Sequence, residues 1–448
     1  MARIGKWLGY AGGALLLLGA AFYLASRLWP VPAAQRDALA QLRQPPQPLR
    51  GPNLFADLWL LPYAVPSAQR QALLDEDARR FRAWPAGVAF HSAASRYPRV
   101  PDWPAASLPR CRWRGDDCLH TVRAARPAYA AALATQAPLL AAMPTVSEAS
   151  GYRSPFAGST DIQLPAFSLL QIPLTQHSLD FVDGRTQPAL LGVCNDAGVA
   201  RALLASGDNL ITSMIGAAML RGNARLFADM LADMLADLPP QQALPAQCAQ
   251  AFAPLQIDDV SLCKPLRGEA QWTFATFDEL ASDRHAAQRR WYESALVPLA
   301  FDAERSKAML APLFTRACAA DARASLNADR PPSAAQVSAP VAVLSMGCVA
   351  NALGCAMARM PPPSFVRYQA SLQDAAAAMR LTSALLWLRA HPGAQPLPQR
   401  LAALPPDLRG ERRPLQATAD GQGVQVALYA DGEGDALRLP LPGSRLRP

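Results

Sequence analysis

Lysine is nearly missing from this chain of 448 residues, although its formal net charge is +8. Lys6, Lys264 and Lys307 are the only lysines, and the other basic residues are arginines spread along the whole sequence. A nucleic-acid-binding surface needs basic residues gathered in a patch or stripe, with aromatic residues among them. The sequence contains no such cluster, so we expect no nucleic acid partner.

Charge of either sign is scarce, at 17% of residues against 51% hydrophobic ones, which excludes an intrinsically disordered chain. Proline is abundant, with 42 residues, about twice the usual usage of around 5%. Long regular strands are therefore excluded, and the helices are expected to be short or often interrupted. At roughly 150 residues per domain the length suggests two or three units, or one large helical domain.

Established catalytic motifs are also missing. Gly-x-Ser-x-Gly, Gly-x-x-x-x-Gly-Lys and His-Glu-x-x-His do not occur. Ser-x-x-Lys occurs once, from Ser261 to Lys264, but no Lys-Thr-Gly accompanies it, and Pro265 argues against a helix presenting both residues on one face. The sequence favours a non-enzymatic protein with no cofactor.

One long hydrophobic run lies near the amino terminus. Residues Leu8–Ala25 carry no charge, and Trp7 and Trp29 stand where interfacial aromatic residues are found. The run predicts a single transmembrane anchor over residues 1–29. The alternative is a cleaved signal peptide, because the small residues Gly19–Ala21 follow Leu15–Leu18.

The eight cysteines indicate on which side of the membrane the chain folds. Their number is even and no Cys-x-x-Cys occurs, so disulfides are favoured over zinc and no metal site is expected. We therefore expect an inner-membrane protein of a Gram-negative bacterium with its body in the periplasm. The expected pairs are Cys111–Cys118, Cys248–Cys263, Cys348–Cys355 and Cys194–Cys318. The two pairs seven residues apart must close loops, because that spacing covers about 10 Å along a helix.

Five segments follow from the distribution of proline and periodicity: an anchor (1–29), a proline-rich stalk (30–52) with a short helix at Ala33–Arg43, a helical body (53–328), a linker (329–341) and a carboxy-terminal helix with a small sheet (342–448). Helical periodicity predicts further helices at Ser67–Phe81, Leu119–Met143 interrupted at Pro127 and Pro138, Asp196–Leu238 broken at Gly207 and Asp208, Phe277–Leu296, Asp302–Leu326 and Ser364–His391, the last with Ser364 as N-cap.

The remaining segments are predicted to be non-helical. Gly151–Cys194 reads as short strands or loop. Leu415–Ala419, Val424–Tyr429 and Ala436–Leu441 alternate and are separated by Asp and Gly residues, which predicts an antiparallel meander. The predicted fold class is mainly α, with an amino-terminal transmembrane helix and a small carboxy-terminal antiparallel β meander.

Two groups of polar residues are considered as sites, and the first is interpreted as an ordinary helix surface. Arginine and aspartate recur every four residues in the Asp196–Leu238 segment, which is typical of a solvent-facing helix surface with an Arg225–Asp229 pair; the residues are Arg221, Arg225, Asp229, Asp233 and Asp237. His177, Asp180 and Asp183, with Asp161 upstream, form the densest group of metal-capable or acid–base side chains. His91 beside Ser92 is a further base and nucleophile to consider.

The segment Ala378–Leu441 combines a long helix, a proline, a Leu-x-x-Leu helix and strands with a tyrosine beside an Asp-Gly turn; the residues are Pro398, Leu401, Leu404, Tyr429, Asp431 and Gly432. It resembles the carboxy-terminal region of uncharacterised membrane-anchored proteins of proteobacteria, whose tails look like the soluble part of type II secretion pseudopilins. NLITSMIGAAMLRGNARL and LCKPLRGE are similar to the helical middle of that group. The anchor is not contiguous with the tail helix here, so assembly into a pilus is not expected.

Together these features predict a single-pass envelope protein that binds another envelope protein, as an assembly factor or an immunity or inhibitor protein. The alternative is an envelope hydrolase with a site around His177, Asp180 and Asp183, which would need a pocket joining such residues. A component of a secretion apparatus is a third interpretation.

Overall fold

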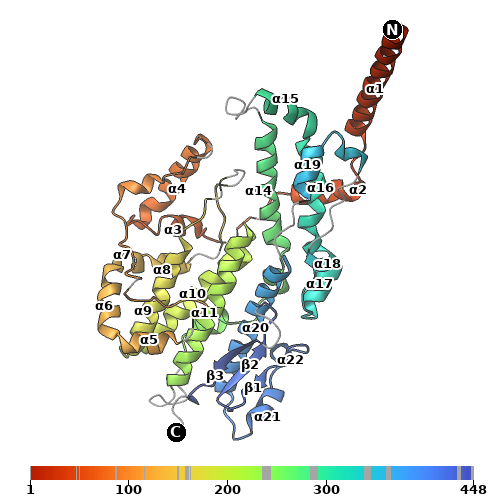
Figure 1. Cartoon of the computed structure of the whole chain (residues 1–448). Helices are drawn as coiled ribbons and strands as arrows, with labels where there is room; N and C mark the ends of the chain where they lie inside the picture. Colours follow the sequence, from red (N-terminus) through yellow and green to blue (C-terminus); the bar gives the residue numbers. More distant parts are fainter. Residues whose placement is uncertain are drawn as a thin grey trace.

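The computed structural model describes residues 2–46, 48–49, 51–85, 88–105, 107–115, 117–148, 151–156, 161, 163–234, 244–282, 291–337, 345–359, 365–430 and 435–444. The chain is mainly α-helical, with one apolar amino-terminal helix and one small sheet near the carboxy terminus (Figure 1). The predicted fold class is confirmed.

Long helices that pack against one another form the centre of the molecule (Figure 1). Helix α10 (Thr186–Ala205) packs along α11 (Leu210–Met234), and α20 (Phe365–Ala390) lies against α11. The predicted break between the first two is confirmed: Gly207 has φ +65° and lies so close to Lys264 that a Cβ there would be 2.6 Å from it. Only glycine adopts this conformation freely, so the turn ends α10 at a fixed point.

Prolines set the boundaries of the amino-terminal helices. Pro127 and Pro138 stand in the first turn of α6 and α7, where a missing N–H costs nothing, and the predicted interruptions are confirmed. The predicted helix at Ser67–Phe81 is α4, and the other helices here are short. The bounds are α3 (Phe55–Trp59), α4 (Ser67–Arg82), α5 (Cys118–Ala124), α6 (Arg126–Thr135), α7 (Ala137–Leu140) and α8 (Met143–Glu148), with a 3₁₀ turn η1 (Ala93–Arg96).

The expectation of strands or loop over Gly151–Cys194 is wrong from residue 167 onward. A 3₁₀ turn η2 (Phe167–Leu170) leads into α9 (Gln171–Val182), and α10 begins at Thr186. Asp183 and Gly184 do form a turn, but it joins two helices, and Gly184 has φ +81°. The buried face of α9 packs on α10, and this tertiary burial outweighs the β-branched residues that suggested strands.

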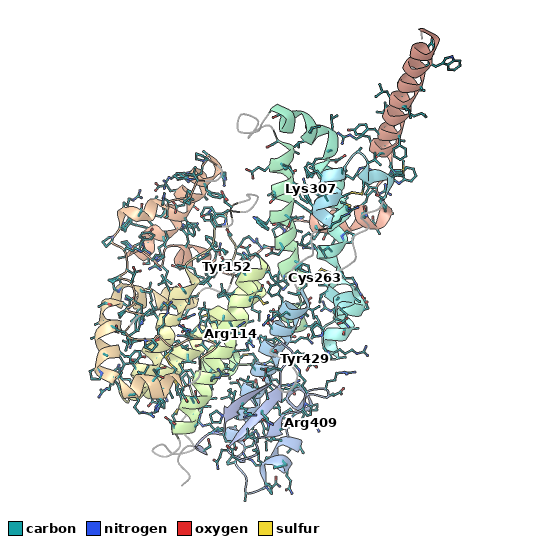
Figure 2. The ribbon with its side chains drawn as sticks, viewed as in Figure 1. Arg114, Tyr152, Cys263, Lys307, Arg409 and Tyr429 are labelled. Atoms are coloured by element: carbon teal, nitrogen blue, oxygen red, sulfur yellow. A yellow bond between two sulfur atoms is a disulfide. The ribbon has the colours of Figure 1, made fainter. Side chains whose placement is uncertain are left out.

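The middle of the chain contributes α14 (Cys263–Ala281), whose first residue Cys263 is labelled in Figure 2. The predicted continuous helix Phe277–Leu296 is wrong, because α14 begins before Phe277 and ends at Ser282, whose backbone is extended. Pro265 lies in its first turn, so Ser261 precedes the helix and is not on one helical face with Lys264. The predicted helix Asp302–Leu326 is α16, a short 3₁₀ turn and α17. The bounds are α12 (Ala246–Ala251), α13 (Ile257–Val260), α15 (Trp291–Ala300), α16 (Ala303–Thr315), η4 (Arg316–Cys318), α17 (Ala320–Asn327), α18 (Ala334–Val337), η5 (Met346–Cys348) and α19 (Ala352–Ala358).

All eight cysteines are paired in disulfides. Cys111–Cys118 and Cys348–Cys355 are confirmed, with Cα atoms 5.4 and 5.7 Å apart. The first closes the loop that leads into α5, and the second joins η5 to α19. The other two predicted pairs are wrong: Cys194 bonds Cys248, and Cys263 bonds Cys318. Packing decides this outcome, because α12 lies on α10 and η4 lies on α14.

The carboxy-terminal part is a helix followed by a three-stranded antiparallel sheet in the order β1-β2-β3, which confirms the predicted meander. Its buried residues Val424, Val426, Leu437 and Leu439 pack toward α20. Asp431, Gly432 and Ser364 lie outside the described residues. The bounds are α21 (Leu397–Ala402), α22 (Pro406–Arg409), β1 (Gln416–Ala417), β2 (Gly423–Ala427) and β3 (Ala436–Pro440).

The amino-terminal helix α1 (Ala2–Leu28) projects from the rest of the molecule (Figure 1). Its residues Tyr10–Leu28 are long and apolar enough to cross a membrane, and almost all of that stretch is uncovered by the rest of the chain. Helix α2 (Ala33–Leu42), the predicted short helix of the stalk, packs on α16 and buries Ala38, Leu39 and Leu42. It therefore joins the folded body instead of standing apart as a spacer.

Candidate functional site

His177 faces α10, not the carboxylates that follow it in sequence. Its Nε2 lies 3.2 Å from a carboxylate oxygen of Asp196, while Nδ1 is buried without a hydrogen-bond partner. The ring occupies the space beside Gly192, where a Cβ would lie 2.2 Å from a ring carbon. His177 thus fills a gap that glycine leaves in the α9–α10 interface.

Asp180 and Asp183 are held by arginines at the α9–α10 turn. Arg185 donates to Asp180 at 2.6 Å and lies 3.0 Å from Asp183, and Arg126 also donates to Asp183. The Arg126 hydrogen bond is the main cause of the lowered pKa of Asp183, so this carboxylate stays ionised. The structure brings these two carboxylates together as a turn clamp, and such an arrangement favours neither a general acid nor an open metal site.

The other candidates lie elsewhere. Asp161 is half-buried in a bend before η2. His91 is exposed, and its neighbour Ser92 donates its hydroxyl to the buried Asp77. Ser92 therefore caps η1 and does not point at His91 as a nucleophile would. Within the described ranges no group of three or more His, Cys, Asp or Glu side chains is arranged to hold a metal ion.

A cleft of about 700 Å³ lies between α11, the loop before α5 and the outer face of the sheet. Its lining combines charges of both signs with amide and hydroxyl side chains. The charged residues are Asp117, Arg225, Asp229, Asp420 and Arg438, and the neutral polar ones are Thr418, Gln422, Gln425 and Ser444. Three segments far apart in the sequence therefore form one polar recess.

The sheet wall follows from strand alternation. Gln425 and Arg438 are direct cross-strand partners, and they face the cleft because their neighbours Val424 and Leu439 point to the core. The turn before β2 presents Asp420, whose carboxylate accepts the Thr418 hydroxyl and the Gln422 N–H, at 2.5 and 3.0 Å. These hydrogen bonds lower the pKa of Asp420, and the bond from the Thr418 hydroxyl contributes most. The carboxylate therefore stays negatively charged.

The α11 wall corrects the interpretation of the Arg/Asp row as a solvent-facing surface. Asp229 is only 6% exposed, and Asp233 pairs at 2.9 Å with Arg123 of α5. Arg225 donates to the Gly115 carbonyl oxygen at 3.0 Å. The disulfide loop and the sheet cover this face from distant parts of the chain, which a helical periodicity cannot reveal. Asp237 lies outside the described residues.

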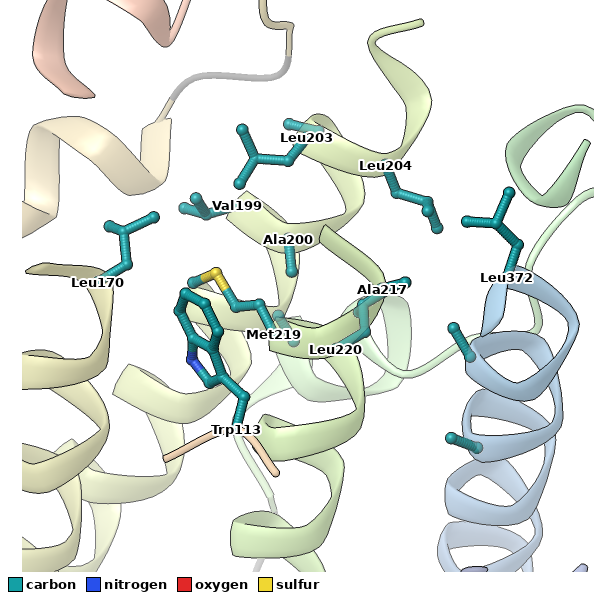
Figure 3. Close-up of a cluster of buried hydrophobic side chains, with 14 of the residues drawn as sticks. Trp113, Leu170, Val199, Ala200, Leu203, Leu204, Ala217, Met219, Leu220 and Leu372 are labelled. Atoms are coloured by element: carbon teal, nitrogen blue, oxygen red, sulfur yellow. The ribbon is translucent and has the colours of Figure 1, made fainter. Parts of the chain in front are cut away.

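The third wall is the Cys111–Cys118 loop, which is fixed from within. Trp113 is buried among side chains of α10 and α11 (Figure 3), and Gly222 of α11 admits it, since a Cβ there would lie 2.6 Å from the Trp113 Cα. The loop ends at Asp117 in a left-handed conformation with φ 57°. A disulfide and an aromatic anchor thus hold Asp117 at the cleft.

Sequence reasoning missed this cleft because its walls come from residues 117, 225–229 and 418–444. The alternation in the strands was the one local signal, since it placed Gln425 and Arg438 opposite the core-facing valines and leucines. The described lining contains no histidine or cysteine, and its charges suit recognition of a polar surface of mixed charge.

No protein-family model, curated protein or solved structure matches this chain.

Proposed function

We propose that this chain is a single-pass, membrane-anchored binding protein of the cell envelope, with its body in the periplasm, that holds another envelope protein in the cleft between α11 and the sheet. The observation that carries the proposal is the cleft itself. Its charged groups are pre-positioned by the sheet register, by a disulfide loop and by a buried helix, so a partner meets an ordered surface at a low entropic cost.

The presence of both positive and negative charges in the cleft supports a protein partner over an anionic polymer. Arg225 and Arg438 share the recess with Asp117, Asp229 and Asp420, and the exposed Asp420 keeps its negative charge because its pKa is lowered. Mixed charge selects a surface of complementary pattern and rejects partners that place like charges opposite each other. A uniformly negative ligand would meet three carboxylates.

The anchor and the cysteines support the location. Leu15, Leu16, Leu17 and Leu18 are 67–77% exposed, an arrangement that is costly in water and favourable in lipid. Four disulfides with no free thiol are typical of proteins folded in an oxidising compartment, such as the bacterial periplasm. An inner-membrane anchor with a periplasmic body satisfies both features.

Site-specific photocross-linking in intact cells tests the proposal. A photoreactive residue at Gln425 probes the cleft, and one at the exposed Gln71 of α4 is the matched control position. The second component is charge reversal, Arg438→Glu in the cleft against Arg323→Glu on the exposed side of α17. Both arginines are exposed, so neither reversal is expected to prevent folding.

We expect one defined envelope protein in the Gln425 adduct and none at Gln71. Arg438→Glu is expected to reduce the yield of this adduct at least about tenfold, because it places a like charge opposite the partner, whereas Arg323→Glu leaves it unchanged. An adduct that survives Arg438→Glu, or that forms equally at Gln71, would contradict a partner site in the cleft.

A further inference from the structure

Large apolar side chains are exposed at the end of the body from which α1 emerges. Leu296 and Leu299 of α15 are 57% and 55% exposed, Val349 after η5 is 41% exposed, and Trp29 after α1 is 49% exposed. Figure 1 shows α15 at the same end of the molecule as α1. Exposed apolar groups gathered in one region mark a contact surface.

The base of α1 is fixed to this surface by hydrogen bonds. Tyr23 donates its hydroxyl to the Leu299 carbonyl oxygen at 2.8 Å, and Arg27 donates to the Pro298 carbonyl oxygen at 2.8 Å. Arg305 in turn donates to the Arg27 carbonyl oxygen, also at 2.8 Å. Two of these hydrogen bonds join α15 to successive turns of α1 and therefore set the height of α15 along α1.

Ser26 provides a second attachment in the same turn of α1. It is fully buried, donates its hydroxyl to the Met346 carbonyl oxygen and accepts the Ala350 N–H at 2.9 Å. Val349 lies between these two residues in sequence, so its exposed side chain belongs to the segment that grips the base of α1. Both α15 and this segment are thus positioned relative to the anchor.

The position of α15 along the axis of α1 follows from helix geometry. Tyr23 lies five residues before the end of α1 at Leu28, which at about 1.5 Å per residue is about 7 Å along the axis. The membrane-spanning stretch is Tyr10–Leu28, so the carboxy-terminal end of α15 lies alongside its last turns. Amphipathic helices on a membrane bury their apolar face about 5–10 Å into the boundary between headgroups and acyl chains.

Two of the carboxy-terminal carbonyl groups of α15 accept hydrogen bonds from α1. The last four carbonyls of any helix have no partner within the helix, and those placed in lipid need one from elsewhere. In α15, which ends at Ala300, the carbonyls of Pro298 and Leu299 accept from Arg27 and Tyr23 of the anchor. These two hydrogen bonds lower the cost of placing the helix end in a region poor in water.

We propose that α15 is an interfacial membrane helix, with Leu296 and Leu299 inserted into the lipid boundary beside α1, and that the body therefore rests on the bilayer in one orientation. This inference rests on the proposed function insofar as α1 must span the membrane. The bilayer is the occupant that the geometry selects, because the same hydrogen bonds that hold α15 also fix it at the level of the span.

Depth-dependent fluorescence quenching in liposomes tests the proposal on the full-length chain. All native cysteines are in disulfides, so a single added cysteine carries the label NBD at Leu296→Cys or Leu299→Cys. Leu16→Cys in α1 reports whether the anchor is inserted, and Val88→Cys, 51% exposed after α4, is an apolar control away from α15. The quencher for the labels at 296, 299 and 88 is a phospholipid with a doxyl group near the headgroup end of its acyl chain. For the label at 16, deep within the stretch Tyr10–Leu28, the doxyl group is near the methyl end of the chain.

We expect the labels at 296 and 299 to be quenched at least about twofold more than the label at 88, as in other interfacial helices. Quenching at 16 with none at 296 and 299 would overturn the interfacial helix and leave the anchor in place. No quenching at 16 would instead refute the anchor. Labels at 296 and 299 that are protected from water but not quenched by lipid, together with disulfide-linked dimers of Leu299→Cys, would assign the surface to a second copy.

Discussion

Arg413 donates a 2.8 Å hydrogen bond to the carboxylate of Asp374, and both side chains are buried, at 3% and 0% exposure. Asp374 also accepts the N–H groups of Tyr429 and Ala430 at 2.9 Å. The guanidinium of Arg413 lies over the ring of Tyr429, which is labelled in Figure 2, and donates to Asp329. One buried network thus joins α20, the end of β2 and the segment after α17, and it positions the sheet that forms one wall of the cleft.

Asp374→Ala is expected to lower the free energy of unfolding by about 3–5 kcal/mol, because it leaves the charge of Arg413 buried with less compensation. Urea unfolding of the detergent-solubilised chain measures this. The matched control is Asp258→Ala, which removes a 2.6 Å pair with Arg323 in which both side chains are more than half exposed. The control is expected to cost less than about 1 kcal/mol. Similar losses for the two variants would show that the network does not stabilise the fold.

Gly192→Ala is expected to destabilise the chain by about 1–3 kcal/mol, since the added methyl group overlaps the His177 ring. In a His177→Ala background the same change is expected to be neutral or to stabilise by about 0.5–1 kcal/mol, the usual gain of alanine over glycine inside a helix. Gly198 of the same helix has nothing within 4 Å of a Cβ, so Gly198→Ala is the control and is expected to stabilise. Thermal unfolding measures these changes. If the destabilisation by Gly192→Ala is the same with and without His177→Ala, the two residues do not contact each other as described.

Asp208 is expected to destabilise the fold at neutral pH. Burial raises its pKa to about 6, although the Ser154 N–H donates to it at 2.8 Å. The folded-state pKa lies above the unfolded value of 3.8, so between these two values the folded chain binds more protons than the unfolded chain. The stability that this proton binding contributes is therefore lost as pH rises from about 4 to about 6.

Asp208→Asn keeps an acceptor for Ser154 and removes the charge. We expect it to be more stable than the parent chain at pH 7 by up to about 3 kcal/mol, with the difference vanishing near pH 4. Urea unfolding at several pH values measures this. Asp420→Asn is the control of opposite sign, because the lowered pKa of Asp420 stabilises the parent above its ordinary pKa. A pH-independent difference for Asp208→Asn would rule out this titration.

The two long disulfide loops are expected to stabilise the chain more than the two short ones. Cys194–Cys248 and Cys263–Cys318 close loops of 54 and 55 residues, and the other two bonds span 7 residues. Loop-closure entropy assigns about 4 kcal/mol to each long loop and about 2 kcal/mol to each short one. Unfolding of double Cys→Ala variants measures the difference.

Peptide mapping of the unreduced protein checks the connectivity on which that prediction depends. Peptides linking Cys194 to Cys248 and Cys263 to Cys318 are expected. A Cys248–Cys263 peptide would instead support the pairing of near neighbours in sequence, and it would exclude both long-loop disulfides, because each uses one of these cysteines.

The sequence by itself determined the features that depend on local patterns. The uncharged run Leu8–Ala25 marked α1, helical periodicity marked α4 and α20, and strand alternation with Asp-Gly turns marked the meander. Each of these patterns acts within about 20 residues, where side-chain period, proline position and turn chemistry largely fix the backbone. The helical nature of residues 171–194 escaped this reasoning because burial against other helices, not local preference, decides it.

Tertiary structure alone decided how these elements meet. Cys194 finds Cys248, Asp117 and Arg438 line one cleft, and Tyr23 of α1 reaches Leu299 of α15, 276 residues later. Such pairs depend on how helices pack around a shared core, and packing is set by the shapes of many side chains together. The spacing of residues in a single sequence does not say which distant residues will meet, because the close packing of the core decides it.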